Sequence, residues 1–193
     1  MKKTLEEFFD EQILEHSRVL KKTKETTQQS FIKIVRLCVD IIRNGNKIIF
    51  FGNGGSASDS QHLATELCVR FSENRKPISA ISLNTDTSVL TAIGNDYGYE
   101  EVFSRQVEGL GLSGDLLIGI STSGNSKNVV KALEVAKKKG VRTVALVGDK
   151  PNGVIQTIAD YVLVAPSANT ARIQECHILM MHTICQLVES ESV

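Results

Sequence analysis

Two patterns of hydrophobic and polar positions divide the chain. Between residue 4 and Gly45 there is no proline and no other glycine, and apolar residues recur at helical spacing, first around Phe8 and Ile13 and then from Phe31 to Ile42. This spacing predicts two helices joined near residues 21–27. The sequence Asn-Gly-Asn at 44–46 then predicts the end of the second helix.

Beyond residue 46 the pattern changes to short apolar runs. They predict buried strands at residues 47–52, 78–83, 115–120, 143–147 and 160–164. Helical patterns lie between and after them, at 56–71, as a pair within 88–107, at 126–139, weakly at 154–158, and at 170–189. This alternation predicts the α/β class, with a doubly wound five-stranded parallel sheet flanked by helices. We expect a single domain over residues 1–193, with residues 1–45 as an N-terminal helical extension of the 46–193 core.

The last predicted helix is more apolar than a surface helix needs to be. Between residues 178 and 188 apolar side chains occupy nearly every face, interrupted by His182 and Gln186. A surface helix of a monomer needs only one apolar face. The pattern therefore predicts that this helix packs against another subunit as well as against the sheet.

Composition and charge narrow the class of partner. The chain has 22 basic and 22 acidic residues and no net charge, which argues against a protein that neutralises nucleic acid or an anionic membrane. No apolar run approaches the roughly 18 residues that span a bilayer, and the first ten residues lack a secretory signal pattern, so we expect a cytoplasmic protein. The cysteines form no CxxC pair and are predicted to be reduced core residues: Cys38, Cys68, Cys176 and Cys185.

Two predicted loops are candidates for ligand binding, because open parallel sheets bind ligands beyond the carboxyl ends of their strands. The first is GNGGSAS at residues 52–58, whose glycines let the backbone approach a ligand and whose N–H groups favour an anion. Gly52, Gly54 and Ala57 also match a loose dinucleotide fingerprint. Asn84 stands where that fingerprint needs an acidic residue, so a nicotinamide cofactor is disfavoured.

The second candidate loop is STSGNS at residues 121–126, at the start of a predicted helix. Its four hydroxyls and one glycine predict a site for a phosphate monoester. No Walker lysine follows, which disfavours a nucleoside triphosphate. The alternative is helix capping by Ser123 or Ser126, which accounts for one hydroxyl rather than four.

Histidines supply the remaining candidate chemistry. His62 and Glu66 share a helix face just after the glycine loop, where such a pair binds a divalent metal, joins an acid to a base, or forms a solvated ion pair. His182 is either functional or a hydrogen-bonded core histidine. His177 is turned by about 140° from His182 on a helical wheel, so the two do not readily face one site. His16 is expected to be solvated.

Several segments together resemble the phosphoheptose isomerases, which are sugar isomerase (SIS) domain proteins. They are GNGGSA at 52–57, DSQH at 59–62 with Glu66, RF at 70–71, LTAIGND at 90–96, GISTSGNS at 119–126, and RIQE at 172–175 with His182. The resemblance covers nearly the whole chain; the serine loop is shared by the wider SIS superfamily, and the combined set is more specific. It implies conversion of sedoheptulose 7-phosphate to D-glycero-D-manno-heptose 7-phosphate through an enediolate, for lipopolysaccharide or related glycans. It also implies a homotetramer with active sites at subunit interfaces.

The resemblance assigns roles residue by residue. Glu66 would be the base and His182 the acid of the proton transfer. One zinc ion per subunit would be held by His62, Glu66, Gln174 and His182. Substrate contacts, with the phosphate on the loop hydroxyls, would come from Asn53, Gly54, Gly55, Glu66, Asn95, Asp96, Ser121, Thr122, Ser123, Ser126 and Gln174. A glutamate bound tightly to zinc is a poorer base, so whether Glu66 does both stays open.

Two departures from the family pattern leave these candidates untouched. Ala171 stands where some relatives have an aspartate before RIQE, and the loop DKPNG at 149–153 replaces a glycine-rich version. Two alternative functions stay open. One is a non-catalytic SIS binding protein like the relatives that associate with the bacterial replication initiator, although those lack the matching glutamate and second histidine. The other is an isomerase of a different sugar phosphate.

Overall fold

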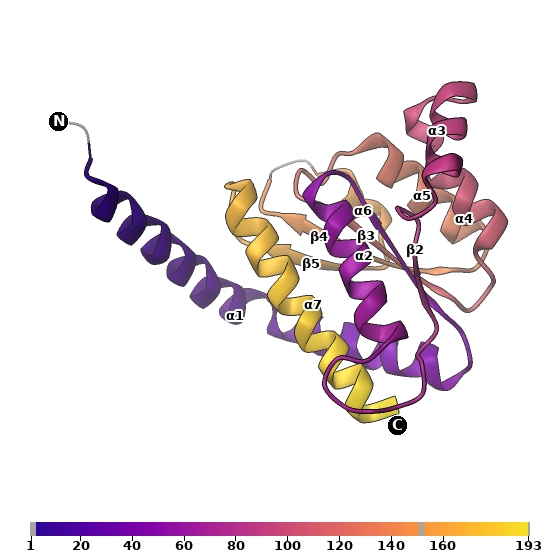
Figure 1. The fold of residues 1–193 in the computed structure, drawn as a ribbon, viewed down its shortest axis with the longest axis horizontal. Coiled ribbons are helices and arrows are strands. Elements are labelled where there is room, and N and C mark those ends of the chain that lie inside the picture. The colour runs from indigo at the N-terminus through magenta and orange to yellow at the C-terminus, as the bar shows by residue number, and fades with distance from the viewer. Residues whose placement is uncertain (1–2, 151–152, 193) are drawn as a thin grey trace.

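The structure is a computed structural model that describes residues 3–150 and 153–192. Its centre is a five-stranded parallel sheet in the order β2-β1-β3-β4-β5 (Figure 1). The strands are β1 (Ile48–Gly52), β2 (Ala80–Ser82), β3 (Leu116–Ser121), β4 (Arg142–Gly148) and β5 (Tyr161–Ala165). The helices are α1 (Leu5–Arg43), α2 (Gly55–Cys68), α3 (Thr87–Asp96), α4 (Ser104–Leu110), α5 (Lys127–Lys138), α6 (Ile155–Ile158) and α7 (Thr170–Ser192), with a 3₁₀ turn η1 (Tyr99–Glu101). The predicted α/β class and parallel sheet are confirmed.

Helices cover both faces of the sheet. Successive side chains of a strand point to opposite faces, and in β1 Ile48 and Phe50 enter one hydrophobic cluster while Ile49 and Phe51 enter the other. The first cluster is completed by α1, α2 and α7, and the second by α3, α4, α5 and α6. Burial on both faces explains why the strands read as continuous apolar runs in the sequence.

The strand order places β1 beside β3 at the centre of the sheet. From β1 the chain moves outward to β2 on one side, and β3, β4 and β5 follow on the other. Gly52 at the end of β1 pairs with Ile120 near the end of β3. The two predicted ligand loops therefore leave the sheet side by side, at the point where such folds bind ligands.

The prediction of two N-terminal helices was wrong, because α1 is one continuous helix of 39 residues. The expected break contains Thr23 and Thr27, whose hydroxyls donate to the carbonyl oxygens of Val19 and Thr23, four residues earlier, at 2.9 and 2.6 Å. These hydroxyls are thus satisfied inside the helix. Both threonines are buried, with Cys176 and Met180 of α7 as neighbours, so the polar stretch continues the packed face of the helix.

Helix α7 lies between α1 and α2 on one face of the sheet (Figure 1). Its large apolar side chains are mostly buried within this chain, and Leu179 is the one of them that stays exposed among the described residues. The apolar surface assigned from the sequence to a second subunit is thus largely covered by neighbouring helices of the same chain. A group of exposed large apolar side chains lies instead on the N-terminal part of α1: Leu5, Phe8, Phe9, Ile13 and Leu14.

Other features differ little from expectation. Strand β2 is shorter than predicted, and α2 ends at Cys68 rather than near residue 71. The four cysteines are free; three are buried, and the partly buried Cys68 donates to the carbonyl oxygen of Ala80. Within the described residues, no helix is both long and apolar enough to cross a membrane.

Candidate active site

The glycine loop begins where β1 ends, and its conformation depends on glycine. A Cβ at Gly52 would lie 2.7 Å from the Ser56 Cβ and 2.9 Å from the Ile120 carbonyl oxygen. Gly54 has φ +58°, in the region that side-chain-bearing residues rarely adopt. The Asn84 side-chain amide pairs with the Gly52 backbone: Oδ1 accepts from its N–H at 3.2 Å, and Nδ2 donates to its carbonyl at 2.9 Å. Asn84, which replaces the acidic residue of a dinucleotide site, thus holds the loop in place.

Side chains from other elements converge on this loop. A Cβ at Gly55 would collide with the side-chain amide of Gln174, so α7 brings Gln174 against the loop. Asn53 exchanges two 2.9 Å amide hydrogen bonds with Asn128 of α5, and the Tyr99 hydroxyl donates to Asn53 at 3.1 Å. The structure therefore connects the predicted contact residue Asn53 to Asn128 and Tyr99, which the sequence patterns did not single out.

The serine loop brings three hydroxyls together at the start of α5. The Ser121 Oγ lies 3.0 Å from the Ser126 Oγ and 3.4 Å from the Ser123 Oγ. Ser126 is the N-cap residue of α5, yet its side chain makes no capping hydrogen bond. The Ser126 hydroxyl is therefore not used for helix capping. Gly124, at φ +67°, turns the chain so that hydroxyls and a helix N-terminus face one place, which suits an anion. Thr122, also a predicted phosphate contact, is half-buried beside them.

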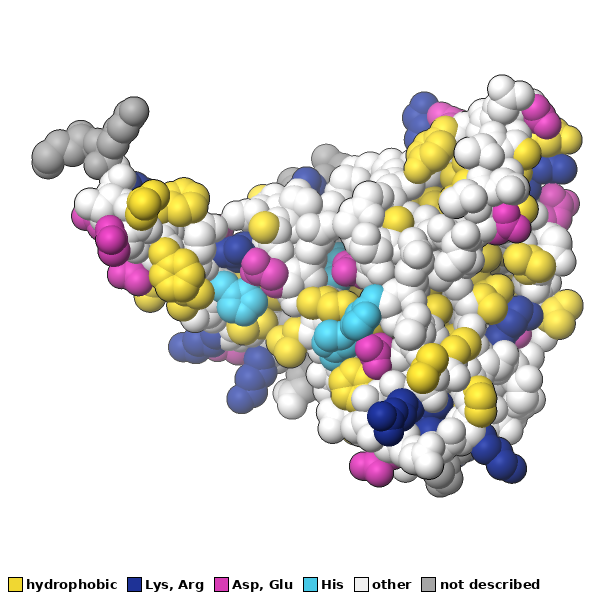
Figure 2. All heavy atoms as spheres, in the orientation of Figure 1, with side chains coloured by type: hydrophobic (Ala, Val, Ile, Leu, Met, Phe, Trp, Pro, Cys, Tyr) yellow, Lys and Arg dark blue, Asp and Glu magenta, His cyan; other side chains and the backbone are white. Residues whose placement is uncertain are grey.

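Two histidines from distant parts of the chain meet between α2 and α7. The Nε2 atoms of His62 and His182 are 2.8 Å apart, and the Glu66 Oε1 lies 3.4 Å from the His62 Nε2. Figure 2 shows histidine side chains gathered on the surface where these two helices run side by side. The Phe71 ring borders the pair, with its centroid 5.7 Å from that of His182. The structure thus brings together the predicted base, the predicted acid and His62.

Asp59 is a member of this cluster that the sequence patterns did not identify as a site residue. Its Oδ2 is buried and has no hydrogen-bond partner in the described part of the chain. Burial raises the pKa of the Asp59 carboxyl, while the imidazoles of His62 and His182 act in the opposite direction. The sequence does place Asp59 on the helix face of His62 and Glu66, because residues 59, 62 and 66 have the spacing of one face.

The predicted zinc ligands meet only in part. Among residues 3–150 and 153–192, no three His, Cys, Asp or Glu side chains form a ready metal centre. No hydrogen bond in the described chain joins Gln174 to His62, Glu66 or His182. The chemistry of the donors nevertheless fits zinc, since two imidazole nitrogens converge beside a carboxylate. The buried Oδ2 of Asp59, which has no hydrogen-bond partner in the described part of the chain, is a further oxygen donor on the helix face of His62.

Other predicted residues lie apart from this cluster. Asn95 and Asp96 are exposed at the end of α3 and hydrogen-bond to each other at 2.8 Å. Within the described residues they make no hydrogen bond to either loop. Ala171 is exposed in the first turn of α7. Of the 149–153 loop, Pro151 and Asn152 lie outside the described residues.

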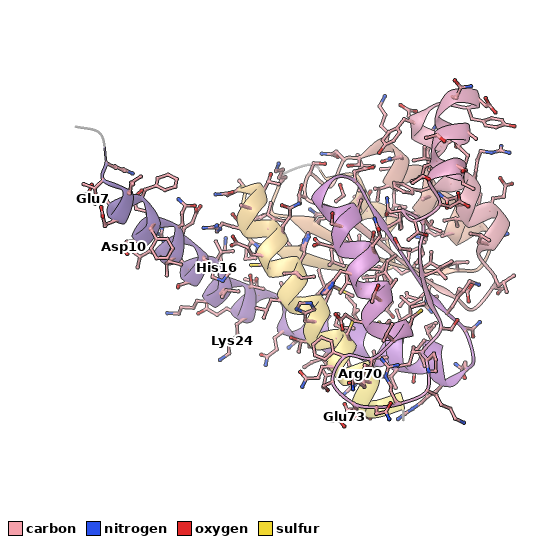
Figure 3. The ribbon with its side chains drawn as sticks, in the orientation of Figure 1. Glu7, Asp10, His16, Lys24, Arg70 and Glu73 are labelled. Carbon is pink, nitrogen blue, oxygen red and sulfur yellow. The ribbon has the colours of Figure 1, made fainter. Side chains whose placement is uncertain are left out.

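The remaining two histidines are not part of the cluster. His177 is buried, its Nε2 lies 3.1 Å from the Val147 carbonyl oxygen, and burial lowers its pKa to about 4, so it is a neutral core residue. His16, expected to be solvated, is 34% exposed and is also paired: its Nδ1 lies 2.6 Å from the Glu175 Oε2. Figure 3 shows His16 on α1 beside the start of α7. Glu175 is held in turn by Arg172, at 2.6 Å.

The fold and its two loops define a class, namely α/β proteins that bind a small anionic ligand at the strand ends. The sequence model of the SIS domain matches residues 12–148. The chain is 52% identical to a phosphoheptose isomerase from Helicobacter pylori strain P12 over 185 residues, which is 96% of each chain. Two solved phosphoheptose isomerase structures are similar over 97% of this chain and 100% of their own. The Neisseria gonorrhoeae protein has 40% identity and a TM-score of 0.91, and the Francisella tularensis protein 31% and 0.93. The chain belongs to the phosphoheptose isomerase family of SIS domain proteins.

Proposed function

We propose that this chain converts sedoheptulose 7-phosphate to D-glycero-D-manno-heptose 7-phosphate. The observation that carries the proposal is the meeting of Glu66 and His182, 116 positions apart in the sequence, through their contacts with His62. Such an isomerisation moves one proton between C1 and C2 of the sugar, so it needs a base and a partner acid at one place. A substrate with a phosphate also needs an anion site, and the serine loop supplies the groups for one.

The serine loop would hold the substrate's phosphate without lysine or arginine. Hydroxyls of Ser121, Ser123 and Ser126, with Thr122 beside them, offer donors to its oxygens at the N-terminus of α5. The neighbouring glycine loop would let the sugar approach the backbone at Gly54 and Gly55. The Asn53 amide of this loop hydrogen-bonds to Asn128 in the first turn of α5, the helix that follows the serine loop. This arrangement agrees with a chain of zero net charge.

Glu66 would take the proton from C1 of the ketose and return it at C2. His182 would move the matching proton between O1 and O2, so that negative charge does not persist on either oxygen. If zinc is held by His62, Glu66, Gln174 and His182, one ion per subunit, it would supply a Lewis acid for that charge.

The direct test is turnover. Purified protein is incubated with sedoheptulose 7-phosphate, with and without added zinc, and heptose 7-phosphate is followed by chromatography. We expect product at a rate proportional to enzyme concentration. The same assay with other ketose phosphates tests the alternative sugar specificity. No product from the correctly assembled protein under either condition would contradict the proposed activity.

We place the reaction in the cytoplasm, because moving an ionised phosphate across a membrane is costly.

Replacing Ser121 by alanine is expected to weaken substrate binding. A hydrogen bond to a charged group contributes about 1.5–3 kcal/mol, so KM should rise by roughly 10- to 100-fold while kcat changes little. Steady-state kinetics measure both constants. Ser113→Ala, at an exposed position preceding β3, is the control and should leave them unchanged. An unaltered KM in Ser121→Ala would remove this hydroxyl from the phosphate site.

We further propose a homotetramer with active sites at subunit interfaces. Support comes from α1, whose N-terminal part projects beyond the sheet in Figure 1 and carries clustered hydrophobic side chains in Figure 2. Phe8 and Phe9 are 58% and 64% exposed, and such clusters on a protein surface mark interaction sites. Asn95 and Asp96 make no hydrogen bond to either loop among the described residues, which agrees with substrate contacts shared between subunits.

Charging this face should break the assembly. Phe8→Glu combined with Phe9→Glu is expected to raise the dissociation constant of the oligomer at least about 100-fold, since each buried Phe contributes roughly 1.5–3 kcal/mol. Light scattering after size-exclusion chromatography measures the mass. Gln28→Glu combined with Gln29→Glu adds the same two charges at exposed polar positions of α1 and should leave the mass unchanged. A double variant with the wild-type mass would show that this face is not the interface.

A further inference from the structure

A buried carboxylate on α7 holds the loop that follows α2. The side chains of Glu189 and Arg75 are each 1% exposed. Glu189 accepts hydrogen bonds from the backbone N–H groups of Phe71, Ser72 and Glu73 at 2.9, 2.8 and 3.0 Å, and from the Ser72 hydroxyl at 3.0 Å. Figure 3 labels Arg70 and Glu73 on this loop, beside the C-terminal end of α7. One side chain of α7 thus fixes three consecutive residues of a loop 116 to 118 positions earlier in the sequence.

The carboxylate remains ionised at neutral pH. Burial alone would raise the pKa of Glu189, but the hydrogen bonds from Glu73, Ser72 and Phe71 outweigh it and lower the pKa to about 2. The ion pair with Arg75, at 2.8 Å, completes its shell of donors.

Arg75 extends this network to the backbone of the candidate base. Its Nε donates to Glu189, and its two terminal nitrogens donate to the carbonyl oxygens of Glu66 and Leu67 at 2.9 and 2.8 Å. These are carbonyls of the last turn of α2, which have no partner within the helix. The planar guanidinium therefore ties Glu66 and Glu189 into one rigid unit.

The same network borders the candidate acid. His182 lies two turns before Glu189 on α7, and Phe71, whose N–H is bound by Glu189, packs against the His182 ring. A buried ion pair is weak evidence for stability, because removing two charges from water costs about as much as their attraction returns. A pair that is bonded to the Glu66 backbone and, through Phe71, linked to the His182 ring is better explained by the positions it enforces.

We propose that Glu189 and Arg75 are positioning residues, which set where the Glu66 carboxylate and the His182 imidazole stand relative to each other. The assignment to catalysis rests on the proposed isomerase function. Neither residue is expected to touch the substrate; both act through Glu66, Phe71 and His182.

Kinetics separate positioning from stability. Glu189→Gln puts an NH₂ group against backbone N–H donors, and Arg75→Lys keeps the charge but loses the planar fork. Because a misplacement of about 1 Å can cost about 100-fold in rate, kcat should fall by roughly 10- to 100-fold in each, with KM within about threefold. The thermal unfolding temperature is measured in parallel.

Asp115→Asn is the matched control. The Asp115 side chain is 2% exposed, pairs with Lys47, and accepts backbone N–H groups of Lys47 and Leu112. It precedes β3, at the end of the sheet opposite the two loops. Asp115→Asn should lose about as much stability as Glu189→Gln and keep the wild-type kcat.

A second readout does not depend on turnover. The sequence contains four histidines, so selective isotope labelling gives a small set of ring signals in NMR. Glu189→Gln should shift the signals of His182 and His62 and leave that of His177 in place. Asp115→Asn should leave all four unchanged.

Two outcomes overturn the proposal. In the first, Glu189→Gln and Asp115→Asn lose the same stability and also the same kcat. In the second, the NMR signals of His62 and His182 do not shift in Glu189→Gln. If Glu189→Gln does not fold, Arg75→Lys carries both comparisons. If the wild-type protein does not isomerise the substrate, the proposed function fails, while the NMR comparison still decides whether the pair positions the two side chains.

Discussion

Replacing Glu66 by glutamine or His182 by asparagine is expected to lower kcat by roughly 100- to 10,000-fold, the range for loss of a positioned general base or acid. Each substitution keeps the approximate shape and hydrogen-bonding capacity of the side chain and removes its ability to exchange the proton. Because Glu66 and His182 both contact His62 and neither is part of the hydrophobic clusters, the fold should survive either change. Steady-state turnover of sedoheptulose 7-phosphate measures the effect.

The two roles are separated by solvent exchange. In deuterium oxide, a base that removes the C1 proton allows deuterium to enter the substrate even when the reaction does not finish. Glu66→Gln should abolish this exchange, while His182→Asn should retain a measurable part. Glu25→Gln and His16→Asn lie outside the cluster and serve as controls. Wild-type turnover in either active-site variant would refute the corresponding role.

The central strands β1, β3 and β4 were predictable because they are buried on both faces, and such a strand is a short, largely apolar run. The continuity of α1 was not. Thr23 and Thr27 are polar by type but satisfy their hydroxyls inside the helix, so they pack like apolar residues. A periodicity rule that scores threonine as polar places a break there. The pairing of His16 with Glu175 depends on where α1 crosses α7, which no local pattern encodes.

Part of the candidate site was likewise predictable from the sequence, and part was not. The spacing of His62 and Glu66 predicts that they share a helix face, and the two loops follow from glycines and hydroxyls at strand ends. Contacts between α2 and α7 depend on the packing of helices that are far apart in sequence, and only the family resemblance linked His182 to His62. Asp59 shares the helix face of His62, but nothing in the sequence shows that its carboxylate oxygen is buried without a partner.

Replacing Gly52 by alanine is expected to lower the free energy of unfolding by about 2–4 kcal/mol and to raise KM. The added methyl would meet the Ser56 Cβ at 2.7 Å and the carbonyl oxygens of Ile120 and Ser56 at 2.9 Å. Ile120 belongs to β3 and Ser56 to the first turn of α2, so neither backbone group moves without disturbing the sheet or the helix. Overpacking of this kind costs about 1–3 kcal/mol, and the displaced backbone hydrogen bonds add to that.

Urea unfolding at one fixed protein concentration measures the loss, because assembly contributes to apparent stability. Gly109→Ala is the matched control: a Cβ at Gly109 meets nothing within 4 Å, and the residue lies inside α4, where alanine should stabilise by up to about 1 kcal/mol. The two substitutions add the same methyl group and are expected to change the free energy of unfolding in opposite directions. Unchanged stability in Gly52→Ala would mean that β1 and β3 are not held at the spacing that sets the two ligand loops side by side. If Gly52→Ala loses stability but keeps the wild-type KM, the spacing of β1 and β3 matters for the fold and not for substrate binding.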